Sequence, residues 1–135
     1  MATVPPIIRH MIVCDDVAPG DATRASFNVL GVVHTIRPGP GQTFPLHHSG
    51  LCVYLMLTGG VGTGAIQIRV VEADTGVDLF GSPVHQVTFP TDRHEVSGIV
   101  FRVTGCVFPR PGLYWVEFHH DGVVVGQESI VVRAA

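Results

Sequence analysis

The stretch LYWVEFHHDGVVVGQESIVV, residues 113–132, carries the strongest fold signal in this chain. Two runs rich in β-branched and aromatic residues flank Asp121 and Gly122. An Asp-Gly pair in such a position favours a two-residue turn, because both of its residues must adopt positive φ. The stretch therefore predicts a β-hairpin with strands over 113–120 and 123–132.

Side chains along the first of these strands alternate between two faces, as the geometry of a strand requires. One face holds Tyr114, Val116, Phe118 and His120, and the other holds Trp115, Glu117 and His119. We expect the first set in the core and the second as a surface that contacts a partner, since exposed aromatic residues often anchor partners. The reverse assignment, with Trp115 in the core, stays open at this point.

The return strand of the hairpin changes the parity of its apolar positions. Val123 and Val125 precede Gly126, whereas Ile130 and Val132 follow it with the opposite parity. One extra residue in the strand reconciles the two sets. The pattern therefore predicts a two-residue turn that pairs His120 with Val123, His119 with Val124 and Phe118 with Val125, followed by a β-bulge at Gly126-Gln127.

The rest of the chain shows short apolar runs separated by turn residues and almost no helical period. The predicted strands cover residues 7–15, 24–36, 51–58, 65–73, 84–89, 96–104, 113–120 and 123–132. Strands separated by turns at this spacing are typical of an antiparallel sandwich. The chain is thus expected to be all-β, an immunoglobulin-like antiparallel β-sandwich of about eight strands without substantial helix.

The segment LCVYLMLT, residues 51–58, does not alternate. Its two faces are both apolar, because Cys52, Tyr54 and Met56 oppose a face of leucines and valine. Parallel or central strands that are apolar on both sides need cover on both sides. A loop or another subunit would supply that cover, and we expect Tyr54 and Met56 to lie in a dimer interface.

Length and composition predict one domain over residues 1–135. The net charge is −3, and all eight basic residues are arginines without a cluster, so neither nucleic acid nor an anionic membrane is an expected partner. Only 14% of the residues are charged, which favours self-association.

No signal peptide or apolar run of membrane-spanning length is apparent, and a cytoplasmic location is expected. The three cysteines then stay reduced, although a Cys52–Cys106 disulfide remains an alternative.

Eight histidines raise the question of a metal site. A metal site would bring together side chains of the FPLHHSG and EFHHDG segments, with His10 as a further candidate; its residues are His47, His48, His120 and Asp121. Against it, neighbouring histidines on a strand point to opposite faces, and no metal-binding spacing such as H-x-H or C-x-x-C occurs. No nucleophile elbow or phosphate loop occurs either. We therefore expect no cofactor and no catalytic residue.

The segment FPRPGLYWVEFHHDG is similar to the end of many immunoglobulin-like sandwiches, in which a Pro-Gly-x-Tyr turn precedes a long hairpin. Over most of its length, the chain also resembles a family of small bacterial proteins known only as a domain of unknown function. That resemblance rests on segments such as CDDV, FNVLGVVHTI, LCVYLMLTGG and IQIRVVEADTGVDLF. The matching positions are Asn28, Gly31, Gly112, Tyr114 and Gly122. The resemblance implies a fold, and it implies no catalytic residue.

The sequence thus predicts a non-enzymatic interaction module that forms homo-oligomers or recognises another protein. Its expected contact residues are Tyr54, Met56, Trp115, Glu117 and His119. A metal-binding protein or metal-dependent enzyme that uses the paired histidines is the second hypothesis. A structural subunit of a virion or shell is the third, because low charge suits tight assembly.

Overall fold

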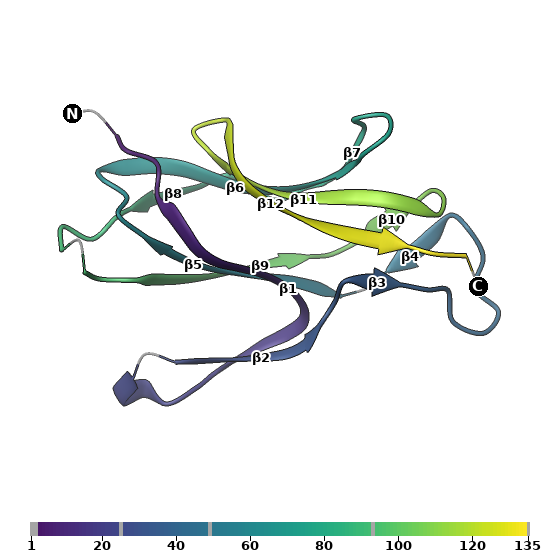
Figure 1. Cartoon of the computed structure of the whole chain (residues 1–135), viewed down its shortest axis with the longest axis horizontal. Helices are drawn as coiled ribbons and strands as arrows, with labels where there is room; N and C mark the ends of the chain where they lie inside the picture. Colours follow the sequence, from purple (N-terminus) through teal and green to yellow (C-terminus); the bar gives the residue numbers. More distant parts are fainter. Residues whose placement is uncertain (1–2, 25, 49, 93, 135) are drawn as a thin grey trace.

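In the computed structural model, two β-sheets pack face to face around a hydrophobic core (Figure 1). The structure describes residues 3–24, 26–48, 50–92 and 94–134. One sheet has the strand order β2-β1-β5-β9. The other has the order β3-β12-β11-β6-β7, with β8 also paired to β6, and β4 and β10 form a separate pair. The strands are β1 (Ile7–Pro19), β2 (Phe27–Val32), β3 (Thr35–Ile36), β4 (Leu46–His48), β5 (Leu51–Thr58), β6 (Thr63–Glu72), β7 (Asp78–Gly81), β8 (His85–Thr88), β9 (Ser97–Val103), β10 (Cys106–Phe108), β11 (Gly112–His120) and β12 (Val123–Val132).

This architecture confirms the all-β class. Within the described ranges the only helical element is η1 (Ala22–Arg24), a single 3-10 turn. No helix in that part of the chain has the length and apolar character needed to cross a membrane. Strand pairs are antiparallel except for β12 and β3, which run parallel.

The structure has more strands than the expected eight, because four elements of two to four residues are too short to show an alternating pattern. These elements are β3, β4, β7 and β10. The strand predicted over residues 24–36 is wrong in its extent. It divides into β2 and β3, which belong to different sheets, and the chain crosses between the layers near Val33. The backbone N–H of Val33 donates to the carbonyl of Val13 at 2.8 Å and fixes this crossing.

The core lies between the inner faces of β5, β9, β6 and β11, and their alternating side chains fill it. Tyr114, Val116 and Phe118 are buried, which confirms the expected face of β11 and rejects the reverse assignment. Aromatic rings meet across the layers: the ring centroids of Phe101 and Phe118 are 6.3 Å apart. Full burial of such side chains contributes about 1.5–3 kcal/mol each.

The β11–β12 hairpin has the predicted turn. Asp121 and Gly122 both have positive φ, at 49° and 79°, and His120 pairs with Val123. The predicted bulge is misplaced, however, because Phe118 pairs with Gly126 and Val125 is the extra residue. Next to the bulge, the end of the Ile8 side chain of β1 packs over Gly126: a Cβ on this glycine would lie 2.3 Å from Cδ1 of Ile8. A larger residue at position 126 would displace the end of that side chain.

Both faces of β5 are covered, but one cover comes from the same chain. The inner face packs into the main core, whereas Cys52 and Tyr54 join a second cluster with Cys14 and Val17. We call residues 15–32 the arm; they comprise the second half of β1, η1 and β2. The arm bends away from the sandwich and runs back beneath the sheet (Figure 1). Its Phe27 ring lies 5.3 Å from the ring of Tyr54, measured between centroids.

Candidate functional site

The arm carries three exposed large apolar side chains on one strand. Phe27, Leu30 and Val32 of β2 are 39%, 49% and 65% exposed. No charged residue lies between Phe27 and Val32 in the sequence. A surface of this kind is unusual on a strand that meets only water.

The arm also has an unpaired edge. Within the described part of the chain, β2 pairs with β1 alone, so its other side presents free backbone N–H and C=O groups. Such a row is a ready template for pairing with another strand. The other edges in the described structure are less suited to this role, since β3, β7 and β8 have two to four residues and β9 carries Arg102.

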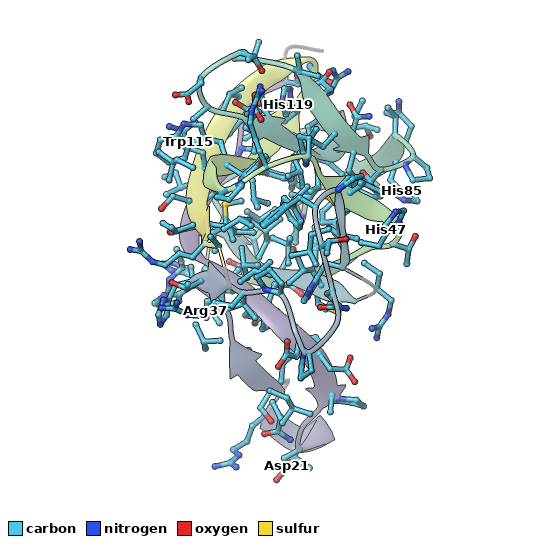
Figure 2. All side chains as sticks on the ribbon, turned by 90° about the vertical axis from the view of Figure 1, so that its right-hand side faces the viewer. Asp21, Arg37, His47, His85, Trp115 and His119 are labelled. Carbon is cyan, nitrogen blue, oxygen red and sulfur yellow. The ribbon has the colours of Figure 1, made fainter. Side chains whose placement is uncertain are left out.

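The expected contact face of β11 does point outward. Trp115, Glu117 and His119 are all half-buried, and Figure 2 shows Trp115 on the side opposite His47 and His85. His119 Nε2 lies 3.0 Å from a carboxylate oxygen of Glu117. Trp115 pairs with Val71 of β6 and with Ser129 of β12. The face is therefore apolar around Trp115 and polar towards the turn.

The other two expected contact residues lie beneath the arm. Tyr54 is only 5% exposed, and burial raises the pKa of its hydroxyl. Met56 is half-buried beside the same cluster. In this arrangement Tyr54 has almost no surface to offer a partner, because the chain itself supplies the cover that a second subunit was expected to supply.

The structure does not bring the paired histidines together. His47 and His48 lie on β4 and pair with β10, whereas His120 and Asp121 lie at the β11–β12 turn, towards the other end of the sandwich (Figure 1). Among the residues that the structure describes, no group of three His, Cys, Asp or Glu side chains is arranged to hold a metal ion. His10 pairs with Met56 on β5.

His120 is a buried side chain whose Nε2 atom has no hydrogen-bond partner among the residues that the structure describes. Its ring packs against Phe89, with centroids 5.8 Å apart, and against the backbone of Gly64. A Cβ at Gly64 would lie 2.2 Å from Nε2. The neighbouring Asp121 carboxylate accepts a hydrogen bond from the backbone N–H of Ala65 at 2.8 Å, which lowers the pKa of Asp121. These contacts fasten the hairpin turn to β6.

A second polar group joins β6 to the turn before β11. Glu72 is buried and receives two hydrogen bonds from Arg110, at 3.1 Å from Nε and 2.5 Å from Nη2. Thr75 donates to the same carboxylate at 2.8 Å. These donors hold the pKa of Glu72 below its usual range. Tyr114 donates its hydroxyl proton to the carbonyl of Arg110, four residues earlier, at 2.5 Å.

Three side chains form a row across adjacent strands on the outer face of the β2-β1-β5-β9 sheet. Cys14 of β1 is directly opposite Cys52 of β5, and Cys52 is directly opposite Arg102 of β9. The Arg102 Nη1 atom lies 3.2 Å from Cys52 Sγ and 3.0 Å from an oxygen of Asp16. Sequence reasoning missed this row, since nothing in the spacing of these residues indicates the strand register that aligns them.

The third cysteine lies elsewhere. Cys106 is buried in the main core, whereas Cys52 belongs to the cluster on the other face of its sheet. All three thiols are free. The alternative of a Cys52–Cys106 disulfide is therefore wrong for this structure, and the cysteine next to Cys52 is Cys14.

A groove with a volume of about 410 Å³ opens between the edge strands β8 and β9. Its lining includes Ile66, His85, Val87, Ile99 and Phe101. Ile66 and Phe101 belong to the main core. The groove marks the side on which the two sheets do not close over that core.

Comparison with known proteins places the chain in a family. Residues 9–133 match the model of a family of unknown function, DUF6941. The chain belongs to this family. The match spans both sheets and the arm, so the arm is within the family domain. A search of curated proteins found no match.

Proposed function

We propose that this DUF6941 protein is a non-enzymatic interaction module that self-associates through the free edge of β2. The observation that supports the proposal is the unpaired edge strand with Phe27, Leu30 and Val32 exposed upon it. Addition of a strand to an open sheet edge is a general mode of protein recognition. The proposed occupant is β2 of a second copy, in antiparallel orientation about a two-fold axis.

Self-pairing suits this strand for an electrostatic reason. In a symmetric antiparallel pair, each residue of β2 faces a residue of the same segment in the partner. The segment from Phe27 to Val32 is uncharged, so no like charges would oppose each other. Leu30 would lie opposite Val32 of the partner, because these two side chains share one face of β2, and apolar pairs of this kind stabilise sheets by about 0.2–1 kcal/mol each.

Other parts of the proposal follow from the sequence expectations. The hydrogen bond from Tyr114 to the carbonyl of Arg110 has the pattern of a tyrosine corner, which supports an immunoglobulin-like relationship. The proposed compartment is the cytoplasm, in which the three free thiols would stay reduced. The outer face around Trp115 is a second contact surface for a protein partner under the same proposal.

The test is the molar mass of the purified chain, measured by light scattering after size exclusion over a range of concentrations. We expect a dimer for the wild-type protein. Val32→Lys should raise the dissociation constant at least about tenfold, which corresponds to about 1.4 kcal/mol, because it removes apolar contact and places an ammonium group beside the partner's strand. Val123→Lys is the matched control, since Val32 and Val123 are 65% and 66% exposed on strands.

Equal dissociation by both variants, or a wild-type monomer at every concentration, would contradict pairing through β2. Dissociation by Trp115→Ala alone would move the interface to the outer face of β11. A large closed assembly would favour the shell-subunit hypothesis. One equivalent of metal in the same peak, measured by elemental analysis and lost in a His47→Ala/His48→Ala variant, would favour the metal hypothesis.

A further inference from the structure

The geometry points to a redox-active thiol pair: Cys14 and Cys52 form a reversible intramolecular disulfide by exchange with a low-molecular-weight disulfide. The two cysteines lie on β1 and β5, outside the β2 edge proposed for self-association. The site uses the row of side chains across β1, β5 and β9.

The two backbones are already spaced for a disulfide. Directly opposite residues of an antiparallel pair have Cα atoms about 4.5–5.5 Å apart and point to the same side of the sheet. Disulfides join residues whose Cα atoms are about 4.4–6.8 Å apart. Cys14 and Cys52 occupy such a position, and Cys14 Sγ already approaches the carbonyl oxygen of Cys52 to 3.7 Å. Bond formation therefore needs a rotation of side chains and little movement of strands.

The charges around the pair make the two thiols unequal. Arg102 places a guanidinium nitrogen 3.2 Å from Cys52 Sγ, so the positive charge stabilises the thiolate of Cys52. Burial acts in the opposite direction and raises the pKa of both thiols, that of Cys14 to about 11. Asp16 lies 4.0 Å from Cys52 Sγ and also opposes the thiolate. Cys52 is thus the attacking thiol and Cys14 the resolving one.

The reaction balances with glutathione disulfide as the oxidant. The Cys52 thiolate attacks one sulfur of that molecule, a Cys52–glutathione bond forms, and the S–S bond of glutathione disulfide breaks to release one glutathione thiolate. The thiolate of Cys14 then attacks Cys52 Sγ and expels the second glutathione. Two protein thiols are oxidised, one glutathione disulfide is reduced to two thiols, and the protons pass from the cysteines to the released thiolates.

The cover over the pair limits access to it. Cys14 and Cys52 are buried beneath partly buried side chains, among which Val29 belongs to β2 of the arm. By contrast, the Arg102 and Asp16 side chains are 61% and 55% exposed. A small oxidant therefore reaches Cys52 past these two side chains or when the arm lifts. Exchange should be slow at neutral pH and faster at alkaline pH, as the thiolate fraction rises.

The experiment equilibrates the folded, full-length protein in glutathione buffers over a range of oxidised-to-reduced ratios. Equilibrium is approached both from reduced protein and from protein oxidised in denaturant and refolded. Thiols are then blocked in acid and the digested protein is mapped by mass spectrometry. We expect a cross-linked peptide pair that contains Cys14 and Cys52, with Cys106 unmodified. Cys106→Ser is the matched control, because it removes a buried thiol and should leave the cross-link intact.

Three further variants test the assigned roles. Cys14→Ser should stop the reaction at a mixed disulfide between Cys52 and glutathione. Arg102→Gln should slow the first exchange step and Asp16→Asn should accelerate it, by about threefold for each unit of change in the pKa of Cys52. If the Arg102–Asp16 ion pair had only a structural role, Arg102→Gln and Asp16→Asn would change the rate of the first exchange step in the same direction. Three free thiols at every buffer ratio, or cross-links that involve Cys106 as often as Cys14, would overturn the inference.

Discussion

At the scale of single residues, Glu72 shows how a buried charge is accommodated in an apolar interior. Its carboxylate lies at the edge of the main core, and Arg110 and Thr75 supply its hydrogen-bond donors. A buried carboxylate is tolerated only when its oxygen atoms are matched in this way. Removal of the charge while the partners remain would leave the Arg110 guanidinium without its counter-ion.

We therefore predict that Glu72→Gln lowers the melting temperature at neutral pH and flattens its dependence on pH in acid. The folded-state pKa of Glu72 is depressed below 4.5, its ordinary value. Its contribution to stability is thus fully present above the unfolded-state pKa and is lost as the pH falls through the folded-state pKa. Thermal unfolding followed by circular dichroism over this acid range measures the effect. Glu128→Gln, an exposed glutamate on β12, serves as the control and should leave the profile unchanged.

Among elements, the β11–β12 hairpin owes its geometry to local chemistry. Asp121 and Gly122 both adopt positive φ, and only the glycine does so without steric cost. We predict that Gly122→Ala destabilises the fold by about 1 kcal/mol and lowers the melting temperature by about 2–4 °C. Gly50→Ala is the matched control, since Gly50 has open space around its Cα and no positive φ. An equal effect of both substitutions would mean that the turn conformation is not the cause.

The same hairpin shows what a sequence can and cannot predict. The turn depends on neighbouring residues and was predictable, whereas for the inward face of β11 the sequence left two assignments open and the structure decided between them. The bulge lies at Val125 and was placed wrongly, and the packing of Ile8 over the neighbouring Gly126 cannot be read from the residues of the hairpin. Tyr54 was expected in a dimer interface, but the arm covers it instead. Nothing in residues 51–58 indicates that Phe27 packs on Tyr54. The Cys14–Cys52 pair, 38 residues apart, was likewise visible only once the register was known.

At the scale of the whole molecule, β5 belongs to two clusters at once. One of its faces stabilises the sandwich, and the other holds the arm through Tyr54 and its neighbours. A Cβ on Gly98 of β9 would lie 2.7 Å from the ring of Phe27, so glycine at this position admits that ring against the sheet. Because the arm packs on the sandwich from one side only, we expect it to lift while the main core stays folded.

We predict that Phe27→Ala accelerates amide exchange in the arm by about tenfold, which corresponds to a loss of about 1.4 kcal/mol for a half-exposed aromatic side chain. Exchange in β6, β11 and β12 should stay unchanged. Hydrogen exchange followed by mass spectrometry of peptides from residues 15–32 and 112–132 distinguishes the two regions. Leu113→Ala is the matched control, as Leu113 and Phe27 are both 39% exposed. Equal acceleration of both regions would show that the arm and the sandwich unfold together.

Because Cys14 and Cys52 lie in the second cluster, the rate at which they are alkylated reports how often the arm opens. If alkylation of Cys14 and Cys52 waits for the arm to lift, its rate in increasing urea gives a slope proportional to the surface exposed in each opening. A shallow slope would describe a hinge motion of one hairpin, and a steep one the unfolding of the whole chain. Cys106 lies in the main core, so its alkylation reports only the unfolding of the whole chain. One reaction on one protein therefore measures both motions.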